Sequence, residues 1–181
     1  MDRYPYLRIE NKRLYSRDMQ YTARDVIKHA PANQPFYLFD KDGITKNRPN
    51  YNTYQRLSSH ADLWIDAGPR ILEDLMDVVM AGATAVILRP SLWPAVNVDE
   101  ILAITDCNLY AYYENPECVV PPKMNGLIIP YTQDPLPNRP LSLTQLPSYL
   151  LNMTGSNQNL DTTPFAGVFL DFSFFASTEH P

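Results

Sequence analysis

The chain has 181 residues, of which 45% are hydrophobic and 19% are charged, and its formal net charge is −5. This length and composition are typical of one globular domain and exclude a chain that is disordered throughout. The negative charge argues against a nucleic-acid-binding surface, and no apolar run approaches the roughly 20 residues that a membrane-spanning helix needs.

Short signals for targeting, metal binding and cofactor binding are weak along the chain. Residues 1–6 lack the apolar core of a signal peptide, so we expect a cytoplasmic protein. Cys107 and Cys118 have no CxxC spacing, the three histidines are scattered, and no GxGxxG follows the first strands. We therefore predict no cofactor and no metal site, and a magnesium ion held by one or two carboxylates stays an alternative.

Between Pro35 and Glu114, short apolar runs alternate with segments of helical period, which predicts βα units and a parallel sheet. We expect the four strands of this region to pair in sequence order. In chain order, the predicted strands cover residues 6–9, 36–39, 63–65, 85–88, 109–113, 126–129 and 166–170. The predicted helices cover residues 19–30, 50–58, 71–80, 98–104 and 143–152, and a polar loop covers 153–164.

Seven parallel strands predict an α/β fold, a reduced TIM-type (β/α) barrel that forms a single domain over residues 1–181. A complete barrel takes at least ~200 residues, so this length predicts minimal helices, a missing unit or a gap in the wall. We expect the sheet to keep an exposed edge or to close irregularly. An open doubly wound sheet is the structural alternative. We expect the Pro-rich segment 130–147 or a second subunit to cover the edge, with contacts from Trp93, Phe172, Phe174 and Phe175.

Three short motifs lie next to successive predicted strands. FDKDGI at 39–44 begins at the end of the strand over 36–39, DAGPR at 66–70 follows the strand over 63–65, and AGA at 81–83 precedes the strand over 85–88, with Glu73-Asp74 before it. In this order and spacing they resemble the second to fourth βα units of the histidine-biosynthesis (HisA/HisF-like) barrels. The resemblance covers about residues 4–114, and it implies a barrel fold with chemistry at the carboxyl ends of the strands.

The chain departs from this family at its catalytic positions. The family's two catalytic aspartates end strands one and five. This chain has Arg8 at the first position, and Tyr112-Tyr113-Glu114 offers a tyrosine or a glutamate at the second. Residues 169–173 also lack the glycines of the family's phosphate-binding turns. The resemblance therefore implies the fold without the family's usual rearrangement, and it carries an association with one-carbon cofactor (methanopterin-type) biosynthesis.

Charged residues at the ends of the predicted strands form the candidate site, because these ends meet at one mouth of a barrel. Crowded carboxylates raise one another's pKa or need a cation, and an arginine can hold two oxygens of a carboxylate or a phosphate. The catalytic candidates are Asp40, Asp66 and Glu114, and the substrate-binding candidates are Arg8, Asp42, Arg70, Arg89, Asp134 and Asp171.

We expect Asp40, Asp66 and Arg89 to converge, with Asp66 within ion-pair reach of Arg89 or Arg70. Asp66→Ala is expected to remove ligand binding at little cost in stability. The alternative is that these charges form ion pairs that only fix loops.

Alternation along residues 109–113 predicts that Tyr110 and Tyr112 share one face of their strand and that Tyr113 lies on the other face. These tyrosines serve either as packing or as a platform for a flat ligand.

We expect a small-molecule isomerase or lyase that acts on a compact polar, phosphorylated metabolite. The alternative function is a non-catalytic barrel that serves as a binding or assembly subunit. The expected partners are a small-molecule substrate and either a second copy of the chain or a partner subunit, with no nucleic acid and no membrane.

Overall fold

The computed structural model describes residues 2–31, 34–131, 146–153 and 165–176. In these residues, the strands are β1 (Asp2–Glu10), β2 (Arg13–Ser16), β3 (Met19–Tyr21), β4 (Pro35–Asp40), β5 (Asp62–Asp66), β6 (Ala83–Leu88), β7 (Asn108–Tyr112), β8 (Gly126–Tyr131), β9 (Ser148–Asn152) and β10 (Gly167–Asp171). The helices are α1 (Ala23–His29), α2 (Lys41–Lys46), α3 (Tyr51–Ser58), α4 (Leu72–Met80), α5 (Val98–Leu102) and α6 (Ser173–Ala176).

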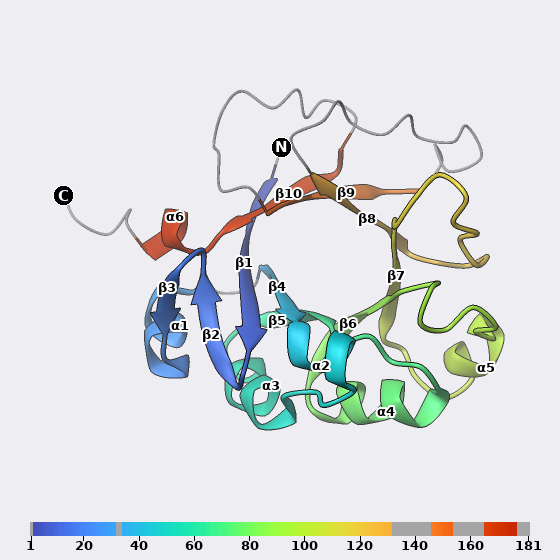
Figure 1. Ribbon diagram of the computed structural model, residues 1–181, viewed down its shortest axis with the longest axis horizontal. Coiled ribbons are helices and arrows are strands. Elements are labelled where there is room, and N and C mark those ends of the chain that lie inside the picture. Colours follow the sequence, from blue (N-terminus) through green and yellow to red (C-terminus); the bar gives the residue numbers. More distant parts are fainter. Residues whose placement is uncertain (1, 32–33, 132–145, 154–164, 177–181) are drawn as a thin grey trace.

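Eight parallel strands form a closed barrel in the order β1, β4, β5, β6, β7, β8, β9 and β10 (Figure 1). The barrel closes where β10 pairs in parallel with β1, from Asp2 beside Gly167 to Tyr6 beside Asp171. The predictions of seven strands and of an exposed sheet edge are therefore wrong. The chain can be this short because few helices join the strands in the described residues. Residues 113–125, for example, join β7 to β8 through turns and without a helix. The fold is a parallel barrel, and the described residues hold too few helices to establish the TIM type.

The prediction for the region between Pro35 and Glu114 is confirmed, because β4, β5, β6 and β7 are parallel neighbours in sequence order. The predicted helix over 71–80 is α4, which buries Leu75 and Val78. Its apolar residues recur at the three- and four-residue spacing that places them on one helix face.

The predicted helix over 143–152 is wrong where the structure describes it, because Ser148–Asn152 forms strand β9. This segment lies between β8 and β10 and pairs with both, so its backbone groups complete the barrel wall. The start of the predicted helix over 19–30 also differs. Met19–Tyr21 pairs with β2 as strand β3, and α1 begins only after Thr22, whose side chain and that of Asp25 cap each other's backbone N–H groups.

The strands bury both of their faces, and each face contributes to a separate core. Ten buried residues form the core inside the barrel: Tyr6, Tyr37, Trp64, Ala85, Ile87, Tyr110, Tyr112, Ile128, Leu151 and Phe169. The larger core lies between the outer faces of the strands and the surrounding segments, and Tyr113 belongs to it. The predicted split of the tyrosines is confirmed. Inside the barrel, Tyr110 stacks on Trp64 with 4.1 Å between ring centroids, so these rings pack against each other.

Figure 1 shows α3, α4 and α5 outside the part of the barrel formed by β4 to β7. The side chain of Phe172 is fully buried against Phe36 and Tyr21, so the structure does not support its predicted role as a subunit contact. Trp93 and Phe175 are partly buried against the outer core, and the side chain of Phe174 lies outside the description. Within the described residues, no helix has the length and apolar character to cross a membrane.

Candidate functional site

An ion pair between Asp66 and Arg89 lies at the carboxyl ends of β5 and β6, inside the barrel. Arg89 Nε is 2.8 Å from Asp66 Oδ1, and Arg89 Nη2 is 2.6 Å from Asp66 Oδ2. The Asp66 side chain is fully buried and 11% of the Arg89 side chain is exposed. The predicted contact between Asp66 and Arg89 is confirmed, and its two parallel hydrogen bonds are the geometry in which a guanidinium binds a carboxylate most strongly.

Aromatic residues of the inner core surround this pair. Tyr37 donates its hydroxyl to Asp66 Oδ2 at 2.8 Å. The guanidinium carbon of Arg89 lies 3.7 Å from the ring centroid of Tyr112 and 5.5 Å from that of Phe39. Neighbouring strands supply Phe39, Asp66, Arg89 and Tyr112, so these residues form a continuous row along the rim.

Asp66 keeps the guanidinium group of Arg89 in its charged state. Burial on its own lowers the pKa of Arg89, but the charge of Asp66 and its hydrogen bonds outweigh burial, and the pKa lies above its usual value. Burial, together with the negative charge of Asp66, raises the pKa of Tyr37 well above that of a free tyrosine. Tyr37 is therefore a neutral hydrogen-bond donor to the carboxylate at neutral pH.

A second group of charges continues the row on β1. Arg8 and Glu10 lie on the same side of the strand as Tyr6, by the alternation of side chains along β1. Glu10 Oε2 is 3.4 Å from Arg8 Nε, and Glu10 Oε1 is 2.5 Å from the Nζ of Lys41, the first residue of α2. The hydrogen bond and charge of Lys41 lower the pKa of Glu10, so this partly exposed carboxyl group is ionised at neutral pH.

Arg8 Nε is buried and has no hydrogen-bond partner, although Glu10 lies within ion-pair range. A buried N–H group without an acceptor is costly, and sites that bind ligands commonly contain such groups. Sequence reasoning missed Glu10 and Lys41. The signal that could have found Glu10 is its period-two spacing from Tyr6 and Arg8 on a strand with two buried faces.

Asp40 does not converge with Asp66 and Arg89, which corrects the predicted cluster. In the pairing of β4 with β5, Phe39 lies beside Asp66, so Asp40 is one residue further on and faces the outer layer. There its carboxylate accepts hydrogen bonds from Gly43 N at 3.0 Å, Asn50 N at 2.7 Å and the Tyr54 hydroxyl. Burial raises the pKa of Asp40, and these hydrogen bonds oppose the rise. The geometry of Asp40 is that of a helix cap and a loop anchor.

Asp42 and Arg70 also lie outside the barrel. Asp42 belongs to α2 and receives hydrogen bonds from Lys46 Nζ and Lys12 N. Arg70 donates to the carbonyl oxygens of Gly43, Ile44 and Gly68, and so it ties the loop after β5 to α2.

Of the remaining candidates, Glu114 accepts hydrogen bonds from the backbone N and the hydroxyl of Ser91, which joins the loops after β6 and β7. Asp134 lies outside the described residues. Asp171 ends β10 beside Tyr6, but its side chain is also outside the description. Among the described residues, no three His, Cys, Asp or Glu side chains gather in a way that could hold a metal ion.

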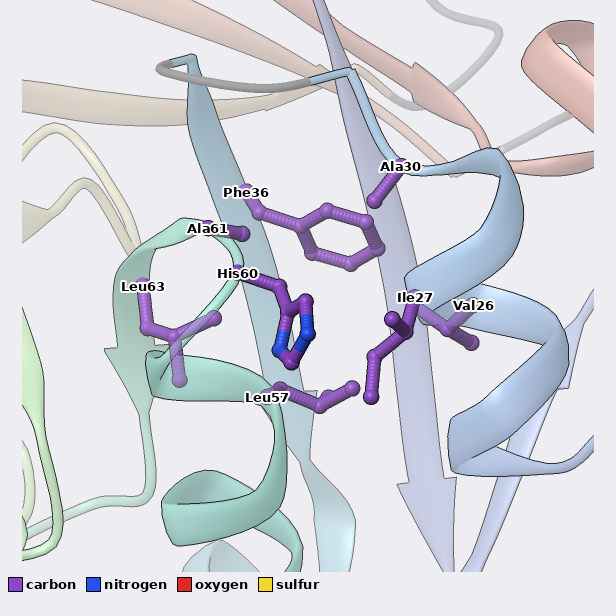
Figure 2. A pocket seen from close by; sticks show the side chains of 8 residues that line it. All are labelled: Val26, Ile27, Ala30, Phe36, Leu57, His60, Ala61 and Leu63. Atoms are coloured by element: carbon purple, nitrogen blue, oxygen red, sulfur yellow. The ribbon is translucent and has the colours of Figure 1, made fainter.

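An apolar hollow lies between α1 and α3, against β4 and β5 (Figure 2). Its empty volume of about 180 Å³ has no room for a water-sized sphere, and His60 is its one polar side chain. The lining residues are Val26, Ile27, Ala30, Phe36, Leu57, His60, Ala61 and Leu63. This hollow is a gap in helix packing and offers none of the convergent polar groups that fix a ligand.

Comparisons with known proteins found no family model and no curated protein that matches the chain. Membership of the histidine-biosynthesis barrels and the link to methanopterin-type biosynthesis therefore stay predictions.

Proposed function

We propose that the protein binds a compact anionic, phosphorylated metabolite at the carboxyl-end mouth of the barrel and acts on it as an isomerase or lyase. The observation that carries this proposal is the row of charged and aromatic side chains along adjacent strands of the rim. The row consists of Arg8, Glu10, Phe39, Asp66, Arg89 and Tyr112, with Lys41 beside it.

The buried ion pair supports a functional role for this row. Replacing a buried ion pair by apolar residues is often neutral or stabilising, so a pair inside an otherwise apolar barrel is poorly explained by stability alone. Asp66 holds the guanidinium of Arg89 over the ring of Tyr112 and fixes its direction. In this proposal, Asp66 is a positioning residue for Arg89, which lies closer to solvent.

Arg8 supports the binding of an anion. Its Nε atom is a buried donor without an acceptor, whereas 35% of the whole side chain is exposed. A phosphate or carboxylate oxygen would satisfy this donor and would gain the charge-assisted hydrogen bond that guanidinium groups form with such oxygens.

Glu10 and Lys41 supply the acid and base chemistry in this proposal. The ionised Glu10 would take a proton from a carbon atom next to a carbonyl group, and the C–H electron pair would form the double bond of an enolate. Arg8 and Lys41 would stabilise the negative enolate oxygen. Where the deprotonated carbon carries a hydroxyl group, that hydroxyl proton moves to the enolate oxygen, the carbon becomes the new carbonyl, and Glu10 returns its proton to the former carbonyl carbon, which completes an isomerase reaction. Loss of a β-leaving group with its electron pair instead completes a lyase reaction.

The test starts from metabolites that co-purify with the native protein, identified by mass spectrometry. We expect a phosphorylated compound to be enriched with the wild type and with Lys28→Met, a control that removes an exposed cation from α1, and to be lost from Arg8→Met. For that compound, the wild type should exchange a carbon-bound proton for deuterium in D₂O, as followed by NMR. Glu10→Gln should bind the compound without exchange. Equal enrichment with Arg8→Met would contradict the proposed site.

A non-catalytic binding or assembly subunit is the second candidate. The contacts of the predicted catalytic residues favour this function. Asp40, Asp66 and Glu114 all form hydrogen bonds that hold neighbouring segments of the structure together. This function predicts a dimer or larger assembly by light scattering at micromolar concentration, together with no proton exchange in any co-purified compound. A monomer that exchanges protons would reject it.

A further inference from the structure

A basic hollow lies outside the barrel mouth, between the turn that joins β1 to β2 and the segment around the end of α2. It encloses about 510 Å³, which falls in the ~300–1,000 Å³ range of small-molecule sites. Its lining residues are Asn11, Lys12, Asp42, Lys46, Arg48, Pro49 and Asn50.

The charge of this hollow is opposite to that of the whole protein. Lys12, Lys46 and Arg48 bring three positive charges and Asp42 brings one negative charge, whereas the chain has a net charge of −5. Gathering like charges in one concave region costs free energy unless an opposite charge neutralises them, and a concave surface also concentrates their field.

Asp42 neutralises only part of this charge, because its carboxylate is already engaged. It accepts hydrogen bonds from Lys46 Nζ at 2.8 Å, from Lys12 N at 3.0 Å and from Asn50 Nδ2 at 3.3 Å. Burial favours a higher pKa for Asp42, but these hydrogen bonds prevail and lower its pKa to about 2. The buried carboxylate thus tethers Lys46 and orients the turn at Lys12.

The side chains of Lys12 and Arg48 are exposed and form no ion pair or hydrogen bond within the part of the chain that the structure describes. The backbone that presents them has ordinary turn geometry. Asn11 and Lys12, with φ values of 50° and 63°, form the two-residue turn between β1 and β2, and Asn47, with a φ value of 51°, is the left-handed cap of α2.

We propose that the basic hollow binds a phosphate group, either as inorganic phosphate or as the phosphate of a phosphomonoester, through Lys12 and Arg48. Arg48 offers a two-point contact to phosphate oxygens, and Lys12 offers a point charge. The residues that line the basic hollow do not include Arg8, Glu10 or Lys41. This binding site therefore does not depend on the function proposed for the mouth.

The test is isothermal titration calorimetry of the purified full chain with inorganic phosphate and with glycerol 3-phosphate, at constant ionic strength. We expect saturable binding by the wild type and at least a tenfold loss of affinity in Lys12→Met/Arg48→Met. Lys28→Met and Arg56→Met remove exposed cations from α1 and α3 and should leave the affinity unchanged. Arg8→Met, titrated in parallel, removes the anion contact proposed for the mouth. Saturable binding that persists in Arg8→Met and is lost in Lys12→Met/Arg48→Met therefore belongs to the basic hollow.

The two phosphate sources are distinguished by their affinities. Equal affinities support a site for inorganic phosphate, and tighter binding of glycerol 3-phosphate supports a phosphomonoester site. The absence of saturable binding in the wild type, or equal binding by the wild type and Lys12→Met/Arg48→Met, would overturn the proposal. Circular dichroism confirms that the variants are folded.

Discussion

Asp66 and Arg89 are joined by two hydrogen bonds of 2.8 and 2.6 Å inside a barrel whose other inner side chains are mostly aromatic and aliphatic. Because the Asp66 side chain is fully buried, its charge has little access to solvent and depends on Arg89 and Tyr37. The stability of the barrel mouth therefore depends on both members of the pair.

Asp66→Asn should destabilise the protein by about 3–5 kcal/mol, because Arg89 keeps its charge and loses its partner. This differs from the sequence-based expectation of little cost, and the reason is the complete burial of the pair. Urea unfolding measures the effect, with Asp62→Asn at the exposed start of β5 as the control. Asp66→Leu/Arg89→Met should regain most of the stability. If Asp66→Asn proved as stable as the wild type, the pair would not be buried in solution.

Tyr54→Phe should destabilise the protein by about 1–3 kcal/mol, because it removes a buried hydroxyl donor from the Asp40 carboxylate. Tyr51→Phe is the matched control, since Tyr51 lies one turn earlier on α3 and touches Tyr54 edge to face. It should change stability by less than about 0.5 kcal/mol. Thermal unfolding of both variants tests this difference, and equal effects would argue against a specific bond to Asp40.

Asp42 should stabilise the protein in a pH-dependent manner. Its pKa is about 2 in the folded chain and 3.8 in the reference state, so the stabilisation is present above pH 3.8 and is lost as the pH falls toward 2. The pKa difference corresponds to about 2 kcal/mol. Urea unfolding of the wild type and Asp42→Asn should therefore give a difference of that size at pH 5 that shrinks toward zero at pH 2. A difference that is constant with pH would disprove this linkage.

Gly43→Ala should destabilise α2 and the loop after β5. A Cβ atom at position 43 would lie 2.5 Å from the backbone carbonyl oxygen of Ala67, closer than packed atoms can approach. Relief requires a backbone shift, so we expect a cost of about 1–3 kcal/mol. Thr45→Ala, an exposed position on the same helix, is the comparison. Chemical denaturation distinguishes them, and an unchanged midpoint for Gly43→Ala would show that the loop moves freely.

The sequence alone was sufficient to predict the central part of the barrel. Runs such as Ala85-Val86-Ile87-Leu88 are apolar on both faces, as buried parallel strands are, and the intervening periodic segment 71–80 identifies α4. These are local signals, and they also predicted that Asp66 and Arg89 meet, because the carboxyl ends of neighbouring parallel strands share one rim.

Only the tertiary structure decided how the barrel closes and which charged residues enter it. Ser148–Asn152 forms a strand because it lies between β8 and β10 and its backbone pairs with both. Its sequence alone is too short to distinguish a strand from a helix. Asp40 and Asp66 each end an apolar strand, yet the register that sets Phe39 beside Asp66 sends Asp40 to the outer layer. Strands that are apolar on both faces do not reveal which face is inside, so the direction of these carboxylates is fixed only when the strands pair.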